Sequence, residues 1–210
     1  GQLGTGSLVS ANSPQAVVGL AQVRAVAVGG NSSCAIHGAD VLSCWGALRG
    51  QATPQAVFAS PTPVAAVAVG TDSTTNAPVG RDYGCLVYKN AAASVACWGD
   101  RNDFGQVGGE PSAPKPVPAD VLMADGSVLQ DVAEIAAGDA MSCALQRSGA
   151  VWCWGMDMFF QVRTTPQRVT LLSGTPLVGR SGLVVGASQP HACVLGDGGS
   201  VWCWGFNGNA

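Results

Sequence analysis

The segment Ser142–Gly155, SCALQRSGAVWCWG, shows the pattern that organises this chain of 210 residues. It predicts a short strand, a tight Ser-Gly turn and a second strand that ends in Trp-Gly, with one cysteine on each side of the turn. The same pattern spans residues 34–46, 85–99, 143–155 and 193–205. Each of the four copies therefore predicts a β-hairpin.

The eight cysteines lie at mirror positions about the four turns. The pairs are Cys34 and Cys44, Cys85 and Cys97, Cys143 and Cys153, and Cys193 and Cys203. Residues that mirror each other across a hairpin face the same side of the sheet, about 4.5 Å apart at a non-hydrogen-bonded site, which a disulfide can bridge. A metal site is the alternative, but zinc sites use close Cys-x-x-Cys pairs with a second pair or histidines nearby, and this chain has only His37 and His191. We expect four disulfides, each within its own hairpin, and hence an oxidising compartment.

The hairpins belong to a longer repeat. Each follows an alternating Val/Ala run that ends in glycine, such as 64–70 or 132–138, and precedes a further extended segment, such as 54–58. The Trp-Gly positions, at Trp45, Trp98, Trp154 and Trp204, are 53, 56 and 50 residues apart. A period near 50 with four short strands is typical of a β-propeller blade. We predict an all-β chain, with one repeat array over residues 1–210 that forms four four-stranded blades.

The two ends continue the repeat. The opening Gly-Gln-Leu-Gly matches Gly105–Gly108, and its distance from the last Trp-Gly across the ends matches the internal spacing. We expect the strand around Pro14–Val18 to complete the last blade, either in its own chain or in a neighbouring copy. A fragment cut at an exposed loop is the alternative. Small Val, Ala and Gly residues on the inner strands suit rings of six to eight blades, so we expect a longer propeller or head-to-tail copies instead of an isolated monomer.

The combined motif resembles a known repeat. Ala-Gly, Ser-Cys-Ala-Leu, Gly-x-Val-x-Cys-Trp-Gly and Gly-Gln-Leu-Gly together resemble the regulator of chromosome condensation type repeat, over essentially the whole chain. The resemblance implies a propeller, usually of seven blades, that serves as a binding platform. Members include a nuclear exchange factor for a small GTPase, bacterial secreted inhibitors of β-lactamases and many bacterial surface proteins. The cysteine pairs resemble those of the bacterial secreted branch, which implies a secreted or cell-surface bacterial protein.

Composition argues against two classes of partner. Only 11% of residues are charged, the net charge is −3, and the ten Lys and Arg residues are scattered. A nucleic-acid surface needs several basic side chains on one face, so we expect no nucleic acid. No apolar run approaches the roughly 18 residues of a membrane helix, so we expect no membrane span.

No catalytic or metal-binding set is evident. Neither His37 nor His191 has a carboxylate partner by spacing, and the inner strands offer only Arg24 and Glu134 to a central channel. The segment Asp100–Asp103 resembles a calcium loop but lacks the closing glutamate, so we expect a turn there and no cofactor. Asn31 begins a glycosylation sequon. We expect a non-catalytic extracellular module that binds a protein or assembles with itself. A secreted inhibitor of another protein, such as a β-lactamase, is the alternative, and an enzyme with a central-channel site is the weaker one.

Two departures from the repeat supply candidate partner-binding residues. The loop before the second hairpin is several residues longer than its counterparts, and the third blade has Phe160 where the repeat has glycine. Partner sites in repeat rings tend to lie on such loops. The candidates are Asp72, Thr74, Asn76, Arg81 and Tyr83 in the first loop, and Met156, Asp157, Met158, Phe159 and Phe160 in the second. The alternatives are a tolerated insertion and, for Phe159 and Phe160, packing into the seam between blades.

Overall fold

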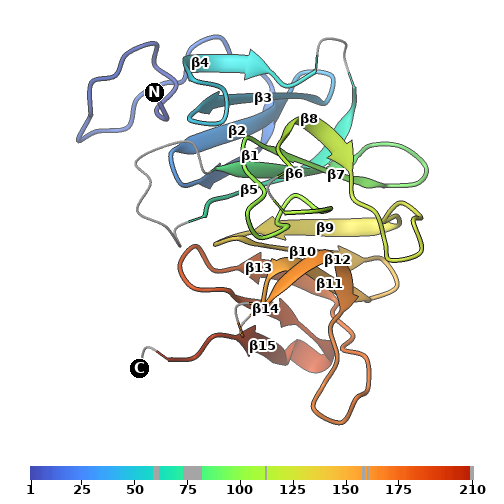
Figure 1. The fold of residues 1–210 in the computed structure, drawn as a ribbon. Coiled ribbons are helices and arrows are strands. Elements are labelled where there is room, and N and C mark those ends of the chain that lie inside the picture. Colours follow the sequence, from blue (N-terminus) through green and yellow to red (C-terminus); the bar gives the residue numbers. More distant parts are fainter. Residues whose placement is uncertain (59–61, 73–81, 112, 158, 160, 209–210) are drawn as a thin grey trace.

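The computed structural model describes residues 1–58, 62–72, 82–111, 113–157, 159 and 161–208, and it contains four antiparallel sheets (Figure 1). Blade 1 consists of β1 (Val23–Gly29), β2 (Ser32–His37), β3 (Val41–Gly46) and β4 (Gln51–Ala56). Blade 2 consists of β5 (Val64–Gly70), β6 (Tyr83–Tyr88), β7 (Val95–Gly99) and β8 (Lys115–Asp120). Blade 3 consists of β9 (Val132–Ala137), β10 (Met141–Gln146), β11 (Val151–Met156) and β12 (Val162–Arg168). Blade 4 consists of β13 (Ser181–Val185), β14 (His191–Leu195) and β15 (Val201–Gly205).

Strand order follows chain order in every sheet, and the four sheets are stacked from blade 1 to blade 4 (Figure 1). This confirms the predicted all-β class and the four-strand repeat in the first three blades. The fourth sheet has three strands in the described part of the chain. Residues 13–18 form no strand and lie beside blade 1, at the far end of the stack from β15 (Figure 1).

Four disulfides close the hairpins as predicted. The bridges are Cys34–Cys44, Cys85–Cys97, Cys143–Cys153 and Cys193–Cys203, and the two Cα atoms are 4.1 Å apart in each. In each case the two cysteines are directly opposite in the strand register. The disulfides indicate an oxidising, extracellular environment.

Consecutive blades are held together by apolar clusters. Each cluster contains side chains at equivalent positions of one blade, two residues from its cysteines. They pack against side chains of the next blade. Examples are Ile36 and Leu42 with Leu86 and Trp98, Val87 and Val95 with Ala144 and Trp154, and Leu145 and Val151 with Ala192 and Val194. The core therefore lies between the sheets and not within any single blade.

Glycine at or just after the end of the inner strands of blades 1 to 3 allows each of these blades to approach the next one closely. A Cβ atom added to Gly138 would lie 2.2 Å from the carbonyl oxygen of Gly186 in blade 4. Gly29 and Gly70 meet the backbone of the following blade in the same way, with Cβ-to-oxygen distances of 2.3 Å to Val69 and 2.7 Å to Gly138. In these three blades the Val/Ala run ends in glycine because a side chain there would push two blades apart.

Candidate interaction surfaces

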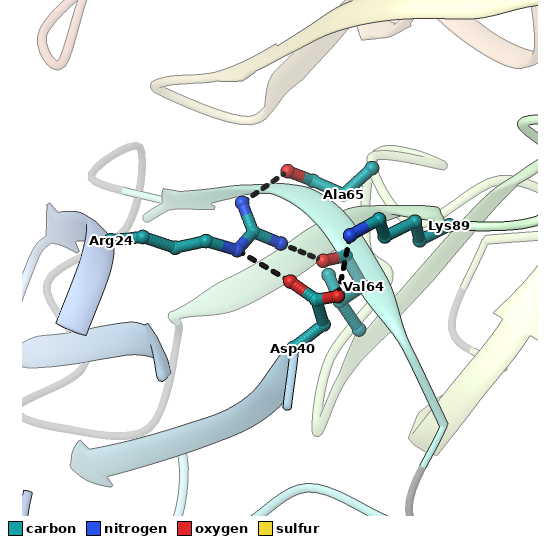
Figure 2. Close-up of polar contacts among 5 residues, drawn as sticks. All are labelled: Arg24, Asp40, Val64, Ala65 and Lys89. Carbon is teal, nitrogen blue, oxygen red and sulfur yellow. Dashed lines mark hydrogen bonds and ion pairs between the residues drawn. The ribbon is translucent and has the colours of Figure 1, made fainter. Parts of the chain in front are cut away.

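A polar clamp joins blades 1 and 2 at one end of the array (Figure 2). Arg24 on β1 donates from Nε to Asp40 Oδ1 at 2.6 Å, from Nη1 to the Ala65 carbonyl at 3.1 Å, and from Nη2 to the Val64 carbonyl. Lys89 of blade 2 donates to Asp40 Oδ2 at 2.6 Å. The hydrogen bond from Lys89 and the contact with Arg24 hold the pKa of Asp40 below its usual value. Arg24, a candidate for channel chemistry by sequence, thus serves a contact between blades.

Glu134 plays the corresponding part between blades 3 and 4. Its carboxylate accepts hydrogen bonds from the backbone amides of Gly182 at 3.2 Å and Leu183 at 2.8 Å. Arg24 thus binds backbone carbonyls at the start of β5, and Glu134 binds backbone amides at the start of β13. Each side chain fixes the start of the inner strand of the next blade.

The inserted loop before β6 contributes buried contacts at both of its ends. Asp72 is buried, and residues 73–81, which include Thr74, Asn76 and Arg81, lie outside the described residues. Tyr83 is fully buried, and its hydroxyl donates to the Met141 carbonyl at 2.7 Å. Burial raises the pKa of this hydroxyl. In this chain Tyr83 is a contact between blades 2 and 3 instead of a surface residue.

The loop after β11 exposes the aromatic side chain of Phe159 to solvent. Asp157 Oδ1 accepts the backbone amides of Phe159 and Gln161, each at 2.9 Å, and its Oδ2 accepts Arg163 Nε at 3.1 Å. Met156 is buried, whereas Phe159 is 71% exposed. Met158 and Phe160 lie outside the described residues. Asp157 therefore shapes a turn that displays Phe159.

This turn borders a groove of about 420 Å³ between blades 3 and 4, whose lining includes Met156, Phe159, Arg168 and Trp204. The tryptophans at the corresponding positions of the other blades differ in their contacts, and the buried indole N–H of Trp98 has no hydrogen-bond partner among the described residues. The Trp45 indole donates to the Gln2 carbonyl at 2.8 Å, and the Trp154 indole donates to the Gln106 carbonyl at 3.0 Å.

Trp204 has no such bond within the described part of the chain, although Gln161 follows β11 at the corresponding place. Gly105, before Gln106, has φ of +74°, a conformation that phenylalanine disfavours. Phe160 is the residue at the corresponding place in the sequence.

The outward face of blade 4 exposes residues that are buried in the other blades. Leu195 and Val201, two positions from the disulfide, are 40% and 61% exposed, whereas the corresponding residues of blades 1 to 3 are at most 1% exposed. Those counterparts are Ile36, Val87 and Leu145 for Leu195, and Leu42, Val95 and Val151 for Val201. At the opposite end, Val26 and Val28 of β1 are 72% and 75% exposed.

The remaining polar candidates have local roles. Asn102 accepts the Val107 amide at 3.0 Å through Oδ1 and donates from Nδ2 to the Glu110 carbonyl at 2.8 Å, so the segment resembling a calcium loop is a self-bonded turn. His37 contacts Ser43 Oγ at 2.9 Å, and His191 contacts the Gln189 carbonyl at 3.0 Å. Among the described residues, no group of three His, Cys, Asp or Glu side chains is placed to hold a metal ion. No helix in that part of the chain is long and apolar enough to cross a membrane.

Comparison with known proteins agrees with this geometry. The profile of the family described as Regulator of chromosome condensation (RCC1) repeat matches residues 132–161. No curated protein matches the chain in sequence. Human WBSCR16 is similar in structure, with a TM-score of 0.69 and 17% identity over 97% of this chain and 55% of that one.

Two further solved structures are similar. The complex of Kap60 with yeast RCC1 (Prp20) contains a chain with a TM-score of 0.62 and 18% identity, over 88% of this chain and 44% of that one. The ectodomain of the Physcomitrella patens receptor kinase CR4 has a TM-score of 0.54 and 20% identity, over 91% of this chain and 44% of that one. The chain thus spans about half the length of these structures. The matched repeat and the shared architecture together show that the chain has an RCC1-repeat, β-propeller-like fold.

Proposed function

We propose that this chain is a non-catalytic extracellular module that binds proteins or assembles with copies of itself through the ends of its blade array. One observation supports this most strongly: Leu195 and Val201 occupy positions that are buried between blades everywhere else, yet they are exposed on blade 4. Exposed apolar side chains grouped on one face are typical of an interaction site. No strand in the described part of the chain pairs with the edge of β15 beside them, and such an edge can pair with a further strand.

The proposal includes completion of the last blade by the strand around Pro14–Val18. It also includes a secreted bacterial origin, because the cysteine pairs resemble those of that branch of the repeat family. A bound protein, another copy of the chain or further blades of a longer propeller would cover the exposed faces.

Inhibition of a secreted protein such as a β-lactamase is the second candidate function. The exposed Phe159 beside the apolar groove between blades 3 and 4 favours it, because an aromatic side chain next to a groove is suited to bind a protein surface.

Light scattering of the native chain over a wide concentration range tests the main proposal. We expect masses that are multiples of 21.1 kDa, or a stable complex with a protein captured from the periplasmic extract of the source cells. Failure to bind either itself or another protein would refute the proposal. A hydrolytic or lyase activity that disappears when a single polar residue is replaced would refute the non-catalytic part.

A further inference from the structure

The outer strands of blades 1 to 3 pair with the third strand in one fixed register. Cys44 lies opposite Gln55, Cys97 opposite Ala119, and Cys153 opposite Gln167. Two residues further on, the outer strand donates an amide to the residue two before the cysteine: Val57 to Leu42 at 2.9 Å, Val121 to Val95 at 3.0 Å, and Val169 to Val151 at 2.9 Å. In blade 4 the corresponding groups are Cys203 and the Val201 carbonyl, and no described strand pairs with them.

Residues 13–17 match the outer strands in sequence, but they are not paired with any strand in this structure. Ser-Pro-Gln-Ala-Val at 13–17 corresponds to Thr-Pro-Gln-Ala-Val at 53–57 and to Thr-Pro-Gln-Arg-Val at 165–169. In this structure Pro14, Gln15 and Ala16 are exposed and form no strand.

The position of the proline within this segment also supports its assignment as an outer strand. The residues that bond the third strand in blade 1 are Gln55 and Val57, so Pro54 has its ring nitrogen on the outer side of the sheet, where no N–H is needed. Pro166 stands at the same step before Gln167. Pro14 keeps this step before Gln15. In the same register Gln15 and Val17 would direct their amides toward the third strand, and Ala16 would direct its amide away from it.

We propose that residues 11–17 of a second copy of this chain pair with the edge of β15 as the outer strand of blade 4, with Gln15 opposite Cys203 and the Val17 amide donating to the Val201 carbonyl. This inference rests on the proposed self-assembly and specifies which strand and which register produce it.

The N-terminal contacts favour a second copy over the same chain. The Gln2 carbonyl accepts hydrogen bonds from Trp45 Nε1 at 2.8 Å and Ser33 Oγ at 3.0 Å, and the Gly6 amide donates to the Ala52 carbonyl at 2.9 Å. These bonds fix residues 1–6 on blade 1, at the opposite end of the stack from β15 (Figure 1). The strand that follows is therefore presented at the end of the array that does not carry the open edge.

The N-terminal segment and blade 1 also form a surface against which blade 4 of a second copy can pack. A groove of about 420 Å³ lies between the N-terminal segment and blade 1, and Val17, Leu20, Val26 and Val28 contribute to its lining. Blade 3 meets blade 4 through the face that holds Leu145 and Val151. A copy whose Leu195 and Val201 face entered the groove would repeat that interface. One docking event would cover both exposed apolar faces and pair the β15 edge.

Two proline variants of the full chain test the inference. Gln15→Pro removes the amide that would bond Cys203, whereas Ala16→Pro removes an amide that would point away from β15, and both residues are exposed in the single chain. We expect Ala16→Pro to assemble like the unmodified chain. We expect Gln15→Pro to need about ten-fold more protein to reach the same mass by light scattering, since it loses one hydrogen bond and leaves a carbonyl unpaired. Circular dichroism of dilute samples should be the same for all three proteins.

The outcomes separate this inference from the proposal beneath it. Equal assembly of both variants, with the unmodified chain still self-associating, overturns the strand register and leaves self-assembly in place. A single-chain mass for the unmodified protein at every concentration overturns the second copy as the occupant. If the Gln15 amide is protected from exchange at that single-chain mass, the strand completes its own blade instead.

Discussion

Leucine truncation at equivalent positions of blades 3 and 4 should separate packing within the chain from packing between chains. Leu145 is 1% exposed and Leu195 is 40% exposed, although both stand two residues after the first cysteine of their hairpins. Replacing a fully buried leucine with alanine costs about 3 kcal/mol of unfolding free energy, because apolar burial is lost and a cavity remains. For Leu195 in a dilute, separate chain we expect about 1 kcal/mol, because much of its surface is already in water.

Urea unfolding of the oxidised protein at low concentration measures these two values. At high concentration the expectation changes, because assembly buries Leu195. Leu195→Ala should then raise the concentration needed for assembly about ten-fold, which corresponds to about 1.4 kcal/mol. An equal loss for Leu145→Ala and Leu195→Ala in the dilute, single-chain state would refute the reasoning, since the blade 4 face would already be covered. Unchanged assembly of Leu195→Ala would show that this face takes no part.

Three further predictions concern contacts between blades. Tyr83→Phe should lower the unfolding free energy by about 1 kcal/mol in chemical denaturation, because the hydroxyl no longer donates to the Met141 carbonyl; an unchanged value would contradict that contact. Gly84→Ser, which restores the serine of blades 1 and 3, should destabilise by about 1–3 kcal/mol in thermal melts, because a Cβ at Gly84 would lie 2.2 Å from the Trp98 ring; a stabilised variant would show that the ring is placed elsewhere. The lowered pKa of Asp40 means that its contribution to stability is present above its ordinary value of 3.8 and is lost as pH falls through the folded value. Asp40→Asn should therefore flatten the pH dependence of stability in that acid range, and an unchanged pH profile would count against the clamp.

The hairpins and their disulfides could be predicted from the sequence because both are local. Cysteines at mirror positions about a turn must face each other across two strands, whatever surrounds them. The blade period followed from repeated Trp-Gly positions for the same reason. The glycines that end the inner strands were visible in sequence, but their steric role depends on the backbone of the following blade.

Contacts between blades could not be predicted in this way. Arg24 binds carbonyl groups of Val64 and Ala65, which carry no side-chain signal in the sequence. Tyr83 stands two residues before a cysteine, like the buried Met141, and that spacing was the available signal for its burial. The departure at Phe160 was visible, but the groove beside Trp204 depends on how two blades meet.

Amide hydrogen exchange at Gln15 and Val17, followed as a function of protein concentration, tests most directly whether the outer strand of one copy completes blade 4 of another. The account predicts fast exchange of both amides at the concentration where light scattering gives one chain mass, and protection of both as the mass rises. The Ala16 amide should remain unprotected throughout, because it would point away from β15. Fast exchange of Gln15 and Val17 in the fully assembled protein, or protection of them in the single chain, would contradict the account.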